Sequence, residues 1–101
     1  MLMYKLLFFL HKGEDKEISK HFFDFTVPYL KDITGHDIPV AKVESNLLLE
    51  QKYSYFCEIS SVSKDEMDKL MNCKAGKELN KDLTEFHKYI TVIAINFYPG
   101  K

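Results

Sequence analysis

The chain begins with an apolar stretch, Met3–Leu10, whose hydrophobic residues occupy both sets of alternating positions. In an extended strand, Leu7 and Phe9 would point to one face and their immediate neighbours to the other. Strands that are apolar on both faces are typically buried on both. The closing stretch YITVIAINFY repeats this pattern, with Ile93, Ile95 and Phe97 on one side and Val92, Ala94 and Tyr98 on the other. Both stretches therefore predict strands that need cover on two sides.

After a polar turn around Gly13, apolar side chains recur at the spacing of a helix. The intervals are four, three, four and four residues, which gives one broad apolar face. The members of this face are Ile18, Phe22, Phe25, Tyr29 and Ile33. The pattern predicts a helix from Asp15 to Ile33 that ends at Gly35, since glycine commonly follows the last helical turn.

Two further strands are predicted in the middle of the chain. One is a long strand over Ile38–Leu49 and the other covers Tyr53–Ser60, with the turn between them at Glu50, Gln51 and Lys52. Alternation along the second strand puts Tyr53 and Tyr55 on one face and Phe56 and Glu58 on the other.

A second helical region follows these strands. Ser63, with Glu66 three residues later, has the spacing of a capping box at a helix start. Gly76 is expected to interrupt this helix. A further helical piece then takes in Leu79, Leu83 and Phe86.

The order β-α-β-β-α-β in 101 residues predicts a single α+β domain, residues 1–101, with a ferredoxin-like antiparallel sheet and two helices on one face. Right-handed crossovers would leave the first and third strands central. The helices can cover only one face of these two-sided strands, so something else must cover the other. We expect a second copy of the chain, giving a homodimer whose two sheets form a dimeric α+β barrel.

Composition narrows the range of partners. Fourteen Lys and Arg residues against fifteen Asp and Glu give a net charge of -1, so no basic field exists to attract nucleic acid or an acidic membrane. No apolar run approaches the roughly 18 residues of a spanning helix, and the N-terminus lacks a signal-peptide cleavage site. Cys57 and Cys73 have neither metal-site spacing nor disulfide density, which favours a cytoplasmic protein with free thiols.

The segment KHFFDFTVPYL, residues 20–30, places a hydroxyl and a proline inside the predicted helix. Ile18, Phe22 and Thr26 are four residues apart and share a stripe facing the sheet, while Pro28 leaves the carbonyl of Asp24 without its helical donor. A kink there would open a space between helix and sheet, with the Thr26 hydroxyl as its polar handle. The alternative is a purely structural accommodation, in which the hydroxyl bonds its own backbone.

Candidate catalytic groups are few. His11 ends the first strand, where its imidazole could reach the mouth of a barrel. Glu58 shares a strand face with Phe56, so its carboxylate should have a partner, such as a lysine, or a raised pKa that suits acid-base chemistry. We expect His21 to be solvated or at a helix edge, and His36, beside Asp37, to lie in a loop without a catalytic role. No spacing among the four histidines suits a metal, and no nucleotide- or phosphate-binding motif is found.

The chain resembles the EthD family of dimeric α+β barrel proteins. The resemblance is carried by the opening MYKLLFFLHKGEDKE, by the first helix, and by the run from YFCEI through KDEMDKLM to AGKELNKDLTEFHKYITVIAINF. Family members usually have an aromatic residue at Ile18, tryptophan at Phe22, histidine at Thr26 and proline at Pro28. Here the proline is kept and threonine replaces the histidine. Glu58, Asp82 and Phe86 match residue types that the family often has at these positions.

This resemblance implies a homodimer that binds a small apolar or aromatic molecule between helix and sheet, without a cofactor. The implied pocket residues are Ile18, Phe22, Thr26, Phe56 and Phe86. The chemistry would be that of a cofactor-independent oxygenase, isomerase or decarboxylase. Because the family histidine is missing, the alternative is a non-catalytic accessory or ligand-sensing module. A haem-handling barrel is a third possibility, but no axial histidine can be assigned.

Overall fold

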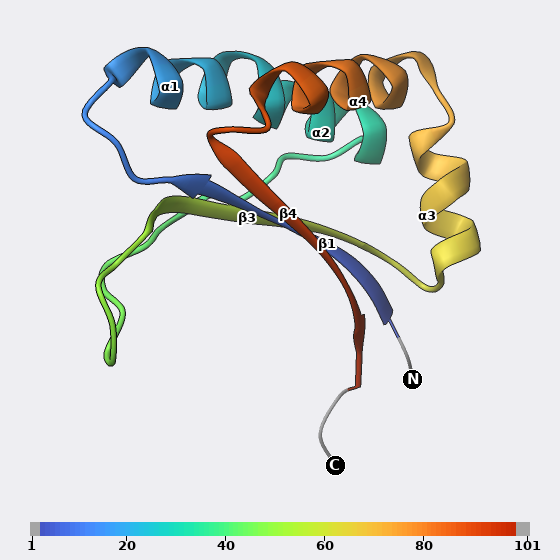
Figure 1. Cartoon of the computed structure of the whole chain (residues 1–101). Helices are drawn as coiled ribbons and strands as arrows, with labels where there is room; N and C mark the ends of the chain where they lie inside the picture. Colours follow the sequence, from blue (N-terminus) through green and yellow to red (C-terminus); the bar gives the residue numbers. More distant parts are fainter. Residues whose placement is uncertain (1–2, 99–101) are drawn as a thin grey trace.

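A computed structural model describes residues 3–98 of the chain. Four antiparallel strands form one sheet in the order β2-β3-β1-β4. The central strands are β1 (Met3–His11) and β3 (Tyr53–Ser61), and the edges are β2 (Ala41–Lys42) and β4 (Ile90–Phe97). The predicted ferredoxin-like order, with the first and third strands central, is confirmed. In Figure 1 the helices of both crossovers lie on the same side of the sheet.

Cross-strand register separates two faces of the sheet. Leu6, Phe8 and Leu10 of β1 lie opposite Ile59, Cys57 and Tyr55 of β3, and these six side chains face the helices. The opposite side, here called the open face, consists of Lys5, Leu7, Phe9, Phe56, Glu58, Ile93, Ile95 and Phe97. Phe8, Leu10, Cys57 and Ile59 are buried in the core. The open face stays partly exposed, with Ile93 at 43% and Phe97 at 40%.

The first crossover is helical throughout, but it is not one regular α-helix. It consists of α1 (Lys16–His21), the π-helical turn η1 (Phe22–Thr26) and α2 (Val27–Thr34), and Gly35 ends it with a φ of 78°. Within η1 the backbone N–H of Val27 donates to the carbonyl of Phe22, five residues back. Pro28 lies in the first turn of α2, where a missing N–H is tolerated.

The π turn changes which residues face the sheet. Phe22, Thr26, Leu30 and Ile33 are buried, whereas Phe25 is 50% exposed. The predicted position of Phe25 was therefore wrong, whereas Phe22 and Ile33 are buried as predicted. Within the π turn the side chain of Thr26, not that of Phe25, is packed into the core.

The predicted strand Ile38–Leu49 was also wrong, because only Ala41 and Lys42 pair, with Phe56 and Tyr55 of β3. Pro39 has no N–H to give to a strand ladder. Residues 43–52 then leave the sheet as a loop. Figure 1 shows this loop, in green, on the side of the sheet opposite the helices.

The predicted face of Tyr53 was wrong, because β3 contains a β-bulge. Leu10 pairs with Tyr55 but His11 pairs with Tyr53, so Ser54 is an extra residue in β3. A bulge reverses the alternation of side chains beyond it. The Tyr53 ring consequently lies 5.0 Å from the ring of Phe9 on the open face.

The second crossover contains α3 (Lys64–Met71) and α4 (Lys74–Phe86). The Ser63 side chain accepts a hydrogen bond from the backbone N–H of Glu66, which confirms the predicted start of α3. Gly76 was expected to interrupt the helix, and this prediction was wrong. The break between α3 and α4 lies before Gly76, which is buried within α4. A Cβ at this position would lie 1.9 Å from the carbonyl oxygen of Met71, so only glycine fits.

Candidate functional site

A hollow of about 340 Å³ opens at the edge of the sheet, where β3 extends beyond the short β2. Because β2 pairs with only Tyr55 and Phe56, no strand of the described residues lies beside the later part of β3 on this side. The segment that leads from α2 to β2 borders the space instead. The hollow is lined by His36, Pro39, Val40, Ala41, Phe56, Glu58, Ile59 and Ser60.

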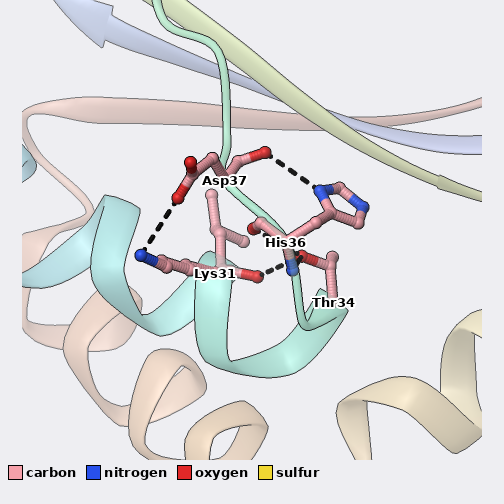
Figure 2. A network of polar contacts seen from close by, with 5 residues as sticks. Lys31, Thr34, His36 and Asp37 are labelled. Carbon is pink, nitrogen blue, oxygen red and sulfur yellow. Dashed lines mark hydrogen bonds and ion pairs between the residues drawn. The ribbon is translucent and has the colours of Figure 1, made fainter.

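The end of α2 places His36 at this hollow. Gly35 turns the chain in the left-handed conformation, and the His36 Nδ1 lies 2.9 Å from the carbonyl oxygen of Asp37. Asp37 is itself paired with Lys31 at 3.0 Å. Figure 2 shows this network, with the His36 ring turned toward the strands.

The hydrogen bond to Asp37 fixes the tautomer of the neutral His36 imidazole. A carbonyl oxygen can only accept, so Nδ1 carries the hydrogen and Nε2 keeps a lone pair. Among residues 3–98, Nε2 of His36 has no hydrogen-bond partner. The hollow therefore has an available proton acceptor on its wall.

Glu58 contributes the acidic group of the same hollow. Its Oε1 lies 3.0 Å from the Nζ of Lys5, and the two side chains are 40% and 18% exposed. The lysine also lies over the ring of Phe97, 4.6 Å from its centre. The predicted partner of Glu58 is thus a lysine. While the face is open to water, an ion pair of this kind is worth at most about 1 kcal/mol.

A second hollow of about 350 Å³ lies on the open face and adjoins the first. Its lining is mainly apolar and consists of Lys5, Leu7, Phe9, Ala41, Val43, Phe56, Glu58, Ile95 and Phe97. Ala41, Phe56 and Glu58 border both hollows. An apolar body with one polar group would find an apolar wall at Phe56 and a carboxylate beside it.

The other predicted site residues lie elsewhere. Phe22 and Thr26 have no exposed surface, and the Thr26 hydroxyl lies 3.3 Å from Oδ2 of Asp82. Ile18 and Phe86 border a third hollow, of about 350 Å³, beside α1 and α4. The five predicted pocket residues therefore do not meet in one pocket, because the π turn packs Phe22 and Thr26 into the core and Phe56 faces the opposite side of the sheet.

His11 is held at the end of β1. Its Nε2 lies 2.6 Å from the Thr91 hydroxyl and its Nδ1 lies 3.1 Å from the carbonyl oxygen of Lys88. In the neutral ring Nδ1 donates and Nε2 accepts the hydroxyl hydrogen. Both ring nitrogens thus have hydrogen-bond partners, and His11 links the end of β1 to the start of β4.

His21, expected to be solvated or at a helix edge, is part of a polar cluster between α1 and α4. Its Nε2 lies 2.6 Å from Oδ1 of Asp82, and its ring stacks on Phe25 at 5.0 Å and on Phe86 at 4.5 Å. The sequence does contain a signal for this: His21 and Phe25, like Asp82 and Phe86, are four residues apart and so share a helix face. Which helix faces would meet could not be derived from spacing alone.

Within residues 3–98, no three histidine, cysteine, aspartate or glutamate side chains gather closely enough to hold a metal ion. In the same range, every helix is too short or too polar to cross a lipid bilayer.

The fold was compared with solved structures. A crystal structure of an ethyl tert-butyl ether D (EthD) family protein from Bacillus halodurans matches with a TM-score of 0.77 and 25% sequence identity. The match covers 95% of this chain and 99% of that one. The chain is EthD-like. The resemblance noted in the sequence is thereby confirmed.

Two more solved structures share the EthD-like fold at lower identity. A protein from Arabidopsis thaliana matches with 20% identity and a TM-score of 0.61, covering 100% of this chain and 97% of that one. Hydroxynitrile lyase from Passiflora edulis matches with 12% identity and a TM-score of 0.65, covering 99% and 96%. At these identities the likeness concerns the fold alone. No family model and no curated protein sequence matches the chain.

Proposed function

We propose that this EthD-like chain is a homodimer that binds a small, largely apolar or aromatic molecule beside Phe56 and Glu58. The observation that carries the proposal is that two hollows of about 340 and 350 Å³ meet at these two residues. One hollow offers the imidazole of His36 and the other the apolar surface of the sheet. Hollows of this size suit a small molecule.

The open face supports the homodimer. Leu7, Phe9, Ile93, Ile95 and Phe97 form an apolar surface without helices over it. Contiguous exposed apolar surface of this kind marks an interface. Lys5 and Glu58 lie within the face as a pair of opposite charge, so a second copy brings a surface of the same balanced composition.

Acid-base chemistry suits the lining of the edge hollow. His36 has an available Nε2, and Glu58 has a second carboxylate oxygen besides the one that binds Lys5. These groups can take up and return a proton without a cofactor. Of the oxygenase, isomerase and decarboxylase reactions, proton transfer in an isomerase makes the best use of such a pair. A structural neighbour that is a lyase supports enzymatic use of this fold.

A non-catalytic ligand-sensing or accessory dimer is the second candidate. It is favoured by the Lys5 contact, which engages one carboxylate oxygen of Glu58, and by Thr26 in place of the family histidine. Turnover of a bound compound, lost on Glu58→Gln, would decide for the enzyme. In either case we propose one domain over residues 1–101, and free Cys57 and Cys73 support a cytoplasmic location.

Native mass spectrometry of the gently purified protein tests the proposal. We expect a species of twice the chain mass, carrying a retained small molecule or accepting one from a panel of aromatic compounds. Phe56→Ala should weaken that binding at least tenfold, because it removes the shared apolar wall. Phe23→Ala is the matched control, since Phe23 is an exposed aromatic residue of η1 outside both hollows. A monomeric wild type, or equal affinity of the two variants, would contradict the proposal.

A further inference from the structure

The loop of residues 43–52, here called the arm, exposes three consecutive leucines. Leu47, Leu48 and Leu49 are 92%, 91% and 70% exposed. Burying a leucine side chain is worth about 1.5–3 kcal/mol, so this arrangement forgoes several kcal/mol in the isolated chain. Such a cluster on an ordered surface indicates that something covers it.

The arm is held in shape without the leucines. The Asn46 Oδ1 accepts hydrogen bonds from the backbone N–H groups of Leu48 and Leu49, both at 3.0 Å. At the base, the Gln51 amide donates to the carbonyl oxygens of Val43 at 2.9 Å and Tyr53 at 2.7 Å. Because tip and base are fixed from within, the leucines are presented for contact at little further cost in chain ordering.

The arm lies on the same side of the sheet as the open face. Figure 1 shows it extending away from the helices, past the plane of the strands. Its first residue, Val43, lines the open-face hollow together with Ala41, Phe9 and Phe56. The apolar surface of the sheet is thus continuous with the base of the arm.

We propose that the arm clasps the second copy of the chain, so that Leu47–Leu49 of each protomer lie against apolar side chains of the other. The inference rests on the proposed homodimer and adds a second contact region to it. A sheet that docks on the open face would occupy the space into which the arm extends. Twofold symmetry would then use the arm twice, once from each protomer.

The charges of the arm favour a protein partner over a lipid surface. Glu44 and Glu50 flank the leucines and Lys52 follows, which gives this segment a net charge of -1. Segments that insert into anionic membranes carry a basic rim instead. The balanced charges of the open face, Lys5 and Glu58, make the same distinction.

Sedimentation equilibrium of Leu48→Asp against wild type tests the arm. We expect the dissociation constant of the dimer to rise at least tenfold, with the circular dichroism spectrum unchanged because the Leu48 side chain is 91% exposed in its own protomer. Val62→Asp is the matched control: Val62 is also an exposed aliphatic residue, at 61%, and lies outside both the arm and the open face. This variant should dimerise as wild type does.

The outcomes separate the two proposals. A monomeric wild type would overturn the homodimer and the arm together. A dimeric wild type whose dissociation constant is unchanged by Leu48→Asp would overturn the arm alone. In that second case, loss of binding to phosphatidylcholine vesicles by Leu48→Asp would assign the leucines to a membrane surface instead.

Discussion

The Nε2 atom of His21 lies 2.6 Å from Oδ1 of Asp82, and this contact joins α1 to α4. The other carboxylate oxygen of Asp82 lies 3.3 Å from the hydroxyl of buried Thr26. One carboxylate, 11% exposed, therefore binds the last residue of α1 and the last residue of η1. The cluster gives Thr26 a structural role at the position where the family usually has histidine.

Removing the imidazole should destabilise the helical layer. We expect His21→Ala to lower the free energy of unfolding by about 2–3 kcal/mol, since it removes a hydrogen bond to a largely buried carboxylate and the stacking on Phe86. His21→Phe restores the ring but not the hydrogen bond, and should lose about half as much. Urea denaturation measures both. His87→Ala, at an exposed helix end, is the control and should change stability by less than about 0.5 kcal/mol.

Among the glycines of residues 3–98, Gly13 and Gly76 lie outside positive φ and should respond oppositely to alanine. A Cβ at Gly76 would meet the Met71 backbone, so Gly76→Ala should cost about 2 kcal/mol or more. At Gly13 nothing lies within 4 Å, and Gly13→Ala should be neutral or slightly stabilising because it restricts the unfolded chain. Thermal unfolding of the two variants compares them directly. Equal melting temperatures would show that the Met71–Gly76 approach is looser than described.

The pair Lys5–Glu58 lies on the face proposed to meet the second copy, so charge reversal should affect association. Glu58→Lys places two like charges together and should raise the dimer dissociation constant about tenfold or more. The double variant Lys5→Glu with Glu58→Lys re-forms the pair and should recover most of this loss. Sedimentation equilibrium provides the readout. If the double variant dimerised as weakly as the single variant, the ion pair itself would not contribute to association.

The two cysteines should differ in reactivity. Burial raises the pKa of the Cys57 thiol from 9.0 to about 12, with a smaller contribution from the negative charge of Glu58. Cys73 is exposed at the start of α4. At pH 8 we expect a thiol reagent to modify one cysteine per native chain and two per unfolded chain. Rapid modification of both in the native protein would show that the core opens near Cys57.

The same shift predicts a pH dependence of stability. The pKa of Cys57 is higher in the folded chain, so the native state holds this proton more tightly than the unfolded state does. The contribution to stability is complete below about pH 9 and is lost as the pH rises toward 12. Cys57→Ala removes it. The stability of wild type should therefore fall more steeply than that of Cys57→Ala over this interval, as measured by urea denaturation at each pH.

The sequence was sufficient to predict the central strands of the sheet but not the short edge strand β2. Two-sided apolar patterns in the first and last strands correctly indicated a sheet with an uncovered face. Leu47, Leu48 and Leu49 have strong apolar character and were assigned to a strand, yet they lie at the tip of the arm. A run of leucines looks the same in sequence whether it is buried in its own chain or presented to another molecule.

The helical face shows a different limit. Ile18, Phe22 and Ile33 were placed correctly and Phe25 was not, because the spacing rule assumes 3.6 residues per turn and the π turn adds a residue that no propensity reveals. The buried Thr26 and the adjacent Pro28 were the local signs of irregularity. They predicted a kink with a pocket, whereas the extra residue is taken up inside a continuous helix.

For the candidate site, strand alternation was sufficient to place Phe56 and Glu58 on one face. His36 was not identified, because its position depends on where α2 ends relative to β3, which are far apart in the sequence. The stacked position of His21 likewise depends on how α1 packs against α4. Residues joined by long-range packing cannot be paired from local spacing.

The π turn also determines where this helix can change in length. A single-turn π segment holds one residue more than the α-helix it interrupts, so the loss of one exposed residue there, such as Asp24, would leave an unbroken α-helix with both flanks in place. The same deletion within α2 would turn everything beyond it by about 100° and carry Ile33 out of the core. Residues 22–26 are thus the part of the crossover where evolution or design can insert and delete without rebuilding the fold.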